Sequence, residues 1–453
     1  MALADSTPLG YIRAQIAQVL IKERHMGNIG LMALMLVPAA ILPLVCGCAG
    51  DGGGRWPPTF VRSRIATTLG GYHSTTRGTI RLVFPHGGKW LVFRGDPDTY
   101  HFSEDGKSWT AAEAPQASRS HLIQGSTIHT LYTVLVEPAP KWVFGTFVCK
   151  GTISGKTIDW QQPSKLDTKL GYYPDIQQDT EGRFTMTGRH AIFDEQRQVV
   201  GTEVLWKRSA RPGDFLEWGP DVRCILHRGD SSVGRHWTKL GSTVHENLVL
   251  EDGKSCVLAM MTVGGVGKLY ANLFDGQKWG AEDIELATGM STWAGTDRRM
   301  CAVFDEQAKV IHLAYVDGEG WLWYRRAKSP YGPEDWSRPV RLHDFRTFTV
   351  VLSLDTSQRP AHLYLLFGKT LFQDGRDLRN TYGALYLQRL AGRTWSQPVL
   401  VSEPDTIDNW YPNMNADVRH GLGILYLRGS GRTRDGEKPP LDILFASTGP
   451  PAR

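Results

Sequence analysis

The segment MCAVFDEQAKVIHLAYVDGEGWLWYRR, residues 300–326, contains three apolar runs separated by short polar turns. Within each run, β-branched and aromatic residues alternate or cluster, which is typical of strands buried on at least one face. The turns contain Asp, Glu and Gly, which favour tight hairpins. VVLSLDTSQRPAHLYLLFGK, residues 350–369, has the same form. The pattern predicts antiparallel sheets in which consecutive strands are neighbours.

Tryptophans recur along the chain at a regular interval. Seven of the 15 tryptophans are separated by 51 to 61 residues. These seven are Trp56, Trp109, Trp160, Trp218, Trp279, Trp336 and Trp395. A four-stranded unit of this length is the signature of a propeller blade. The spacing therefore predicts an all-β, seven-bladed β-propeller of four-stranded antiparallel blades, with six blades as the alternative.

The two ends of the repeat complement each other. After Trp395 the chain has three further strand-like runs, YPNMNADV, GILYLRG and LDILFAS. The fourth, outer strand of that last blade can come from WPPTFV, residues 56–61. We therefore expect residues 56–450 to form a single propeller domain whose last blade is closed by an N-terminal strand.

The composition is that of an ordinary globular protein with a sizeable core. Hydrophobic residues are 41% and charged residues 21% of the 453 residues. The net charge of +5 over this length gives no reason to expect nucleic acid as a partner. We expect no cofactor and no metal, because the cysteines show no C-x-x-C spacing, and we expect a monomer.

The N-terminal segment is expected to direct export. An apolar run of 17 residues, 29–45, is short for a membrane span and typical of the core of an export signal. It ends in VCGCAG, where Gly47 before Cys48 resembles a bacterial lipoprotein signal with Cys48 as the lipidated residue. A plain signal peptide, an uncleaved anchor, lipidation at Cys46 and a start at Met26 are the alternatives.

This reading divides the N-terminus into an export or lipoprotein-type signal region, 1–48, and a Gly-rich tether, 49–55. The membrane would be contacted only through this signal or lipid anchor. The protein is then expected to be a cell-envelope lipoprotein, periplasmic or secreted. An oxidising compartment would permit disulfides, and the sequence leaves open whether the later cysteines pair or stay as buried thiols. These are Cys149, Cys224, Cys256 and Cys301.

Two short patterns resemble a known superfamily. SEDGKSW, residues 103–109, resembles the Asp-box turn of sialidase-type propellers, and the other blades are interpreted as keeping only its Gly and Trp. Residues 174–190 resemble a second pattern of BNR-repeat proteins, P-x-x-x-x-D-x-x-G ending near G-x-H. The resemblance implies a carbohydrate-active propeller, since that group includes sialidases, other glycosidases and lyases of acidic glycans. FVRSRIA, residues 60–66, lacks the proline of the sialidase arginine signature, so an arginine triad is not carried over.

The start of each innermost strand is the expected location of a site. These starts meet at one face of a propeller, where the loops between second and third strands also lie. In order they read GYHSTTRG, RSHLIQG, GYYPD, VHEN, WAGTDRR, DFRTF and NWYPN. GYYPD and NWYPN, at residues 171–175 and 409–413, begin alike because both are predicted to open an inner strand. The hairpin of the first would bring its start beside Arg189 and His190.

Candidate catalytic residues follow from this list. Imidazole titrates near neutral pH and suits proton transfer, tyrosine is the nucleophile in sialidases, and carboxylates can act as acid, base or activator. The candidates are His190, His245, Tyr173, Glu246, Asp175 and Asp297. A hydrogen-bonded or packed structural role is the alternative for each.

Candidate substrate-binding residues combine arginines with aromatic residues. The guanidinium fork grips a carboxylate or sulfate, and aromatic faces stack on sugar rings. The candidates are Tyr172, Arg189, Trp293, Arg298, Arg299, Arg428, Trp410, Tyr411 and Asn413. Charged surface loops that serve solubility are the alternative.

The resulting hypothesis is an exported, exo-acting, sialidase-like glycoside hydrolase whose partner is an anionic oligo- or polysaccharide. A polysaccharide lyase acting on uronate-containing glycans is the first alternative, because the same residues could remove a proton beside a carboxylate. A non-catalytic propeller that binds glycan or protein is the second. Fold alone does not decide between them.

Overall fold

The computed structural model describes residues 56–68, 81–95, 98–115, 118–137, 143–196, 199–230, 244–290, 299–370, 383–403, 409–429 and 441–451. All of them belong to one compact unit, Gly53–Arg453. The predicted signal region and tether, with Cys48, lie outside the described residues. None of the helices within the described ranges is long and apolar enough to cross a membrane.

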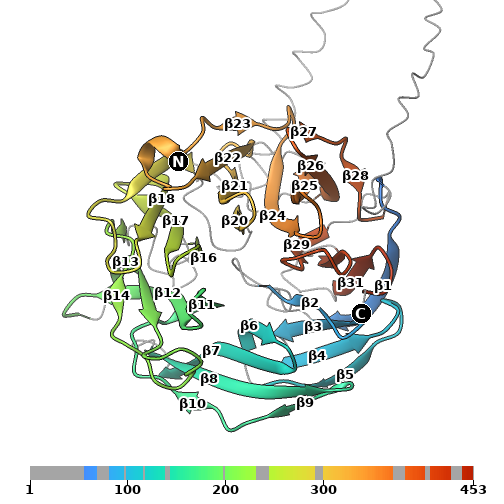
Figure 1. The fold of residues 1–453 in the computed structure, drawn as a ribbon, viewed down its shortest axis with the longest axis horizontal. Helices are drawn as coiled ribbons and strands as arrows, with labels where there is room; N and C mark the ends of the chain where they lie inside the picture. Colours follow the sequence, from blue (N-terminus) through green and yellow to red (C-terminus); the bar gives the residue numbers. More distant parts are fainter. Residues whose placement is uncertain are drawn as a thin grey trace, which may run out of the picture. The chain divides into compact units, whose positions relative to one another are not determined.

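The described strands form seven antiparallel blades arranged in a ring (Figure 1), as the tryptophan spacing predicts. Blade 1 contains β2 (Val83–His86), β3 (Lys89–Gly95), β4 (Asp98–Ser103) and β5 (Thr110–Glu113). Blade 2 contains β6 (Ser118–Gln124), β7 (Thr127–Glu137), β8 (Val143–Ser154), β9 (Thr157–Trp160) and β10 (Ser164–Lys165). Blade 3 contains β11 (Tyr172–Gln178), β12 (Phe184–Phe193), β13 (Val199–Arg208), β14 (Val222–Arg223) and β15 (Gly229–Asp230). Blade 4 contains β16 (Val244–Val249), β17 (Ser255–Val263), β18 (Val266–Phe274) and β19 (Ile284–Met290). Blade 5 contains β20 (Met300–Asp305), β21 (Val310–Val316), β22 (Leu322–Lys328) and β23 (Val340–Arg341).

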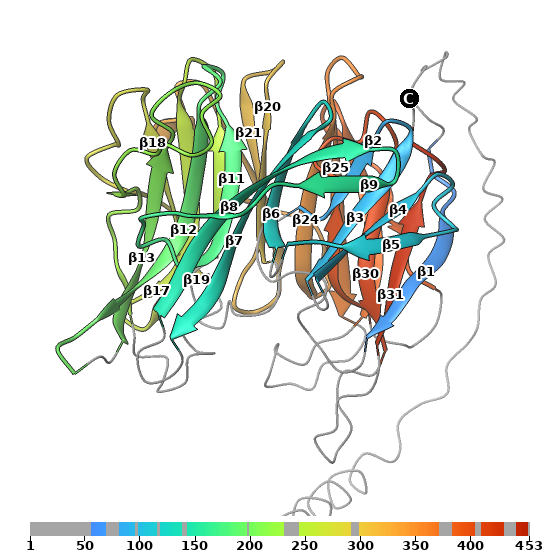
Figure 2. The same cartoon turned by 90° about the horizontal axis from the view of Figure 1, so that it is seen from below.

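Blades 6 and 7 complete the ring and hydrogen-bond to each other at the Gly383–Asn409 pair. Blade 6 contains β24 (Thr347–Asp355), β25 (His362–Thr370), β26 (Gly383–Ala391), β27 (Thr394–Trp395) and β28 (Val399–Leu400). Blade 7 contains β29 (Asn409–Met414), β30 (Gly423–Arg428), β31 (Leu441–Ser447) and the N-terminal strand β1 (Val61–Thr68). Within the described ranges the helical structure is a single 3₁₀ turn, Pro333–Asp335. Figure 2 shows the strands running between two opposite faces of the ring.

The N-terminal strand closes the last blade, as predicted, but it begins later than the sequence suggested. β1 pairs with β31 from Val61 to Thr68, whereas residues 56–61 were expected to form this strand. The physical reason is that Pro57 and Pro58 have no backbone N–H to donate to a sheet. Trp56 instead packs on Tyr364 of blade 6, with ring centroids 6.2 Å apart.

The repeated tryptophans join neighbouring blades. Trp109 of blade 1 packs edge-on against Phe445 of blade 7, with ring centroids 4.9 Å apart. The ring centroids of Trp279 in blade 4 and Trp206 in blade 3 are 5.4 Å apart. The centroids of Trp395 in blade 6 and Tyr324 in blade 5 are also 5.4 Å apart. Such pairs add roughly 0.5–1.5 kcal/mol each to the burial of their area. The period in the sequence is therefore the period of inter-blade packing.

The turn before each of three tryptophans is held by an aspartate. Asp105 accepts the amides of Lys107 and Ser108 at 2.7 and 2.8 Å, and these bonds hold its pKa well below the usual value. Asp214 and Asp275 make the same pair of bonds and likewise precede a tryptophan by four residues. The interpretation that other blades keep only the Gly and Trp is therefore wrong for blades 3 and 4.

Arg81, just before β2, connects blade 1 to three other blades across the centre of the ring. Its guanidinium donates to the carbonyl of Leu352 at 2.6 Å and to that of Met414 at 3.1 Å. It also lies 3.6 Å from Sγ of Cys301. All four cysteines of the described part are buried thiols that form no disulfide with one another. The inner strands are thus linked directly as well as through their sheets.

Candidate functional site

The inner strands lie where the sequence placed them. β6, β11, β16, β20, β24 and β29 each begin a blade and line the centre of the ring in Figure 1. GYYPD and NWYPN both enter such a strand, β11 and β29. Tyr172 is paired with Arg189, so the start of β11 and the end of the hairpin do meet at one face. We call this face, where inner strands begin, the entrance face.

A histidine–carboxylate pair lies at the entrance face of blade 3. Nδ1 of His190 on β12 lies 2.9 Å from Oε1 of Glu203, its direct neighbour on β13. An ionised carboxylate can only accept, so the imidazole N–H donates. This hydrogen bond lowers the pKa of Glu203 below its usual value. The side chains are 25% and 14% exposed, so solvent reaches the imidazole while the carboxylate orients it.

Glu203 was missed by the sequence analysis because a bulge sets its register. His190 pairs with Glu203, but β12 and β13 shift by one residue between Ile192 and Phe193. Without that bulge, the hairpin would place Thr202 opposite His190. Arg228 approaches the same carboxylate, with Nε 3.9 Å from Oε2 of Glu203, and its side chain is 60% exposed.

Basic residues occupy one equivalent register position in three blades. Arg189 pairs with Tyr172, Lys369 with Thr347 and Arg428 with Asn409. In each case the partner is the first residue of the inner strand. Arg428 also lies 3.8 Å from Glu403. The entrance end of the ring therefore has cations in blades 3, 6 and 7, of which Arg189, a predicted substrate-binding residue, is almost fully buried.

Three other predicted residues connect blades to each other. Oδ1 of Asp175 lies 3.2 Å from the hydroxyl of Ser120 in blade 2. Glu246 accepts the amide of Ala302 in blade 5 at 2.5 Å, and Asn413 accepts the amide of Leu82 in blade 1 at 3.0 Å. These contacts give Asp175, Glu246 and Asn413 a place in the scaffold of the ring.

The remaining predicted residues are buried or lie outside the description. His245 on β16, Arg299 before β20 and Tyr411 on β29 are almost fully buried. The backbones of Tyr172, Tyr173 and Trp410 belong to inner strands, but their side chains are outside the described part. Trp293, Asp297 and Arg298 lie outside the described residues altogether. Among the residues that are described, no group of His, Cys, Asp and Glu could hold a metal ion.

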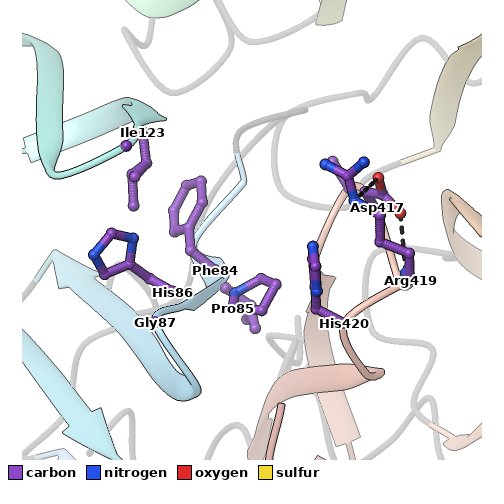
Figure 3. A pocket seen from close by; sticks show the side chains of 11 residues that line it. Phe84, Pro85, His86, Gly87, Ile123, Asp417, Arg419 and His420 are labelled. Atoms are coloured by element: carbon purple, nitrogen blue, oxygen red, sulfur yellow. Dashed lines mark hydrogen bonds and ion pairs between the residues drawn. The ribbon is translucent and has the colours of Figure 1, made fainter. Parts of the chain in front are cut away.

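A pocket of about 420 Å³ lies at the opposite face, where inner strands end (Figure 3). The β2–β3 hairpin, the β6–β7 turn and the turn after β29 line it. His86 and His420 border it, and Asp417 forms an ion pair with Arg419 at 3.1 Å. None of the residues predicted for the site lines this pocket, so it is separate from the entrance face.

Comparison with known proteins finds similar folds. No protein-family model matches the chain. No curated protein matches it either. Among solved structures, polysaccharide lyase Uly1 is 11% identical, with a TM-score of 0.46 over 82% of this chain and 92% of that one. An ulvan lyase bound to -[GlcA(1-4)Rha3S]- is 10% identical, with a TM-score of 0.44 over 81% of this chain and 84% of that one. A Trypanosoma rangeli sialidase bound to the inhibitor DANA is 11% identical, with a TM-score of 0.37 over 83% of this chain and 55% of that one. At these values the likeness is one of fold alone.

Proposed function

We propose that this protein is a carbohydrate-active enzyme that cleaves an anionic polysaccharide by β-elimination, with His190 as the base. The observation on which this rests is the 2.9 Å contact between Nδ1 of His190 and Glu203. With Nδ1–H donated to the carboxylate, Nε2 keeps its lone pair for a substrate proton. The partial exposure of His190 at the entrance face supports access by a sugar.

In the proposed step, Nε2 of His190 takes the proton from the carbon next to the uronate carboxylate. The C–H electrons form a carbon–carbon double bond, and the glycosidic C–O bond on the neighbouring carbon breaks. The departing oxygen takes a proton from water and leaves as a hydroxyl, and the proton on His190 passes to the solvent. A cation beside the substrate carboxylate stabilises the negative charge that develops. Arg228, exposed and close to Glu203, is suited to this role.

Hydrolysis by a sialidase-like route was the first hypothesis from the sequence, and the described side chains favour elimination over it. Hydrolysis needs a nucleophile or a second carboxyl group opposite the acid. Among the described residues, Asp175 and Glu246, its carboxylate candidates, bond to neighbouring blades. A histidine with one carboxylate partner is what proton abstraction requires.

Turnover of acidic polysaccharides by site variants tests the proposal. His190→Ala should lower turnover by about 100-fold or more, since general base catalysis contributes roughly 10²–10⁴. Glu203→Gln keeps the shape but weakens the orienting bond, and should lower turnover by about tenfold with little change in KM. His420→Ala, at the opposite face, is the matched control and should retain activity. Equal activity in His190→Ala and His420→Ala would refute the proposal.

A further inference from the structure

Two arginines contact the indole ring of Trp321 at the entrance face. The guanidinium carbon of Arg346 is 3.8 Å from the centre of its ring, and that of Arg341 is 4.6 Å away. Trp321 belongs to the turn between β21 and β22 of blade 5. The amide of Thr347, the first residue of inner strand β24, donates to Gly320 in that turn at 2.7 Å. The stack is therefore at the same face as His190.

The turn fixes the indole in place. Asp317 accepts the amides of Glu319 and Trp321, both at 2.9 Å. The indole N–H donates to Glu319 at 3.0 Å. Arg346 donates to the carbonyl of Glu319 and lies 3.6 Å from its carboxylate. These contacts are enough to hold the turn against inner strand β24.

Arg341 adds nothing that the turn requires. It is exposed on the outer strand β23, and in the described part of the chain it has no ion-pair partner. Placing a second guanidinium against the same indole adds like-charge repulsion with Arg346. A flat guanidinium on an aromatic face keeps its in-plane N–H groups directed outward. That arrangement suits a carboxylate or sulfate in the plane of the guanidinium.

The nearby acidic groups leave this position open to an anion. Asp317 is engaged by the turn amides and by the indole of Trp323 at 2.8 Å. Glu319 is occupied by Trp321 and Arg346. Asp344, which is exposed, is the remaining carboxylate between β23 and β24. Arg341 is exposed, its guanidinium carbon lies 4.6 Å from the centre of the Trp321 ring, and it takes no part in these bonds.

We propose that Arg341, Trp321 and Arg346 form a subsite for a carboxylate or sulfate of a sugar remote from the cleaved bond. The inference rests on the proposed function and names its substrate more closely. His190 belongs to blade 3 and the stack to blades 5 and 6, and packed sheets are about 10 Å apart. An occupant of both places is longer than one sugar ring. The substrate is therefore an oligo- or polysaccharide with repeated anionic groups.

Binding of polymeric uronates to the full chain tests the subsite without turnover. In a His190→Ala background, affinity electrophoresis would measure binding of alginate and of chondroitin sulfate. Arg341→Ala should weaken binding of at least one of them by about tenfold, as expected for one charge-assisted contact. Arg341→Lys keeps the charge but loses the planar fork, and should recover only part of that loss. Arg393→Ala removes an exposed charge from the β26–β27 turn at the opposite face and is the matched control.

The outcomes separate this inference from the proposed function. Equal binding by the Arg341→Ala and Arg393→Ala variants, or full recovery with Arg341→Lys, would overturn the subsite. With active enzyme, Arg341→Ala should raise KM for the polymer more than it lowers kcat. If binding depends on Arg341 while no glycan is cleaved, the subsite stands and the lyase proposal fails. If cleavage depends on His190 while neither binding nor cleavage depends on Arg341, the lyase proposal stands and the subsite fails.

Discussion

Replacing Arg81 with alanine should destabilise the ring more than any exposed arginine does. Arg81 donates to Leu352 of blade 6 at 2.6 Å and to Met414 of blade 7 at 3.1 Å. A hydrogen bond to a charged group contributes roughly 1.5–3 kcal/mol, and in the variant both carbonyls lose this donor, although the Cys301 thiol remains 3.9 Å from the Leu352 carbonyl. Water that enters the truncated site recovers part of this energy. We expect the free energy of unfolding to fall by about 3 kcal/mol.

The matched control is Arg64→Ala on the closing strand β1. The side chain of Arg64 is 65% exposed and lies 3.6 Å from Asp442, so its loss should cost less than about 1 kcal/mol. Denaturant unfolding followed by tryptophan fluorescence and by far-ultraviolet circular dichroism would give both values and test for a single transition. If Arg81→Ala shifts the midpoint no further than Arg64→Ala, the assignment of Arg81 as a link between blades is wrong.

Two further predictions follow from the closing strand and from a buried histidine. Deleting residues 61–68 exposes the edge of β31, so the shortened chain should associate in size-exclusion chromatography while the full chain does not; a monomeric, equally stable product would contradict this. Burial lowers the pKa of His121 to about 3, and its ring stacks on Phe93 with centroids 3.7 Å apart. In the unfolded chain the His121 imidazole takes up a proton near pH 6.5, whereas in the folded chain it stays neutral until about pH 3. The free energy of unfolding should therefore be highest above pH 6.5 and fall between pH 6.5 and pH 3, by up to about 1.4 kcal/mol per pH unit. His121→Gln should flatten that slope in urea titrations at pH 7 and pH 5, and an unchanged slope would refute the cause.

The fold was predictable because its period is visible in the sequence. Tryptophans such as Trp109 and Trp279 contact the preceding blade, so their spacing reports the size of one blade directly. The closing strand was displaced to Val61–Thr68 because Pro57 and Pro58 cannot pair, which is a local rule that could have been applied. The aspartates of blades 3 and 4 were overlooked because their turns lack the flanking serine of SEDGKSW.

Of the candidate site, only the arrangement of its strands could be predicted from the sequence. The entrance face and the pairing of Tyr172 with Arg189 followed from the repeat. The directions of Asp175 and Glu246 depend on contacts with other blades, which a single strand does not reveal. The partner of His190 depends on a one-residue bulge, and the alternation of a strand cannot show a bulge of this kind.

Absorbance of an unsaturated uronate is the most direct test of the account. The intact protein would be incubated with a panel of acidic polysaccharides, and new double bonds would be followed in the ultraviolet beside reducing ends. The account predicts absorbance from at least one polysaccharide, and its loss in His190→Ala but not in His420→Ala. New reducing ends without absorbance, or absorbance that persists in His190→Ala, would contradict it.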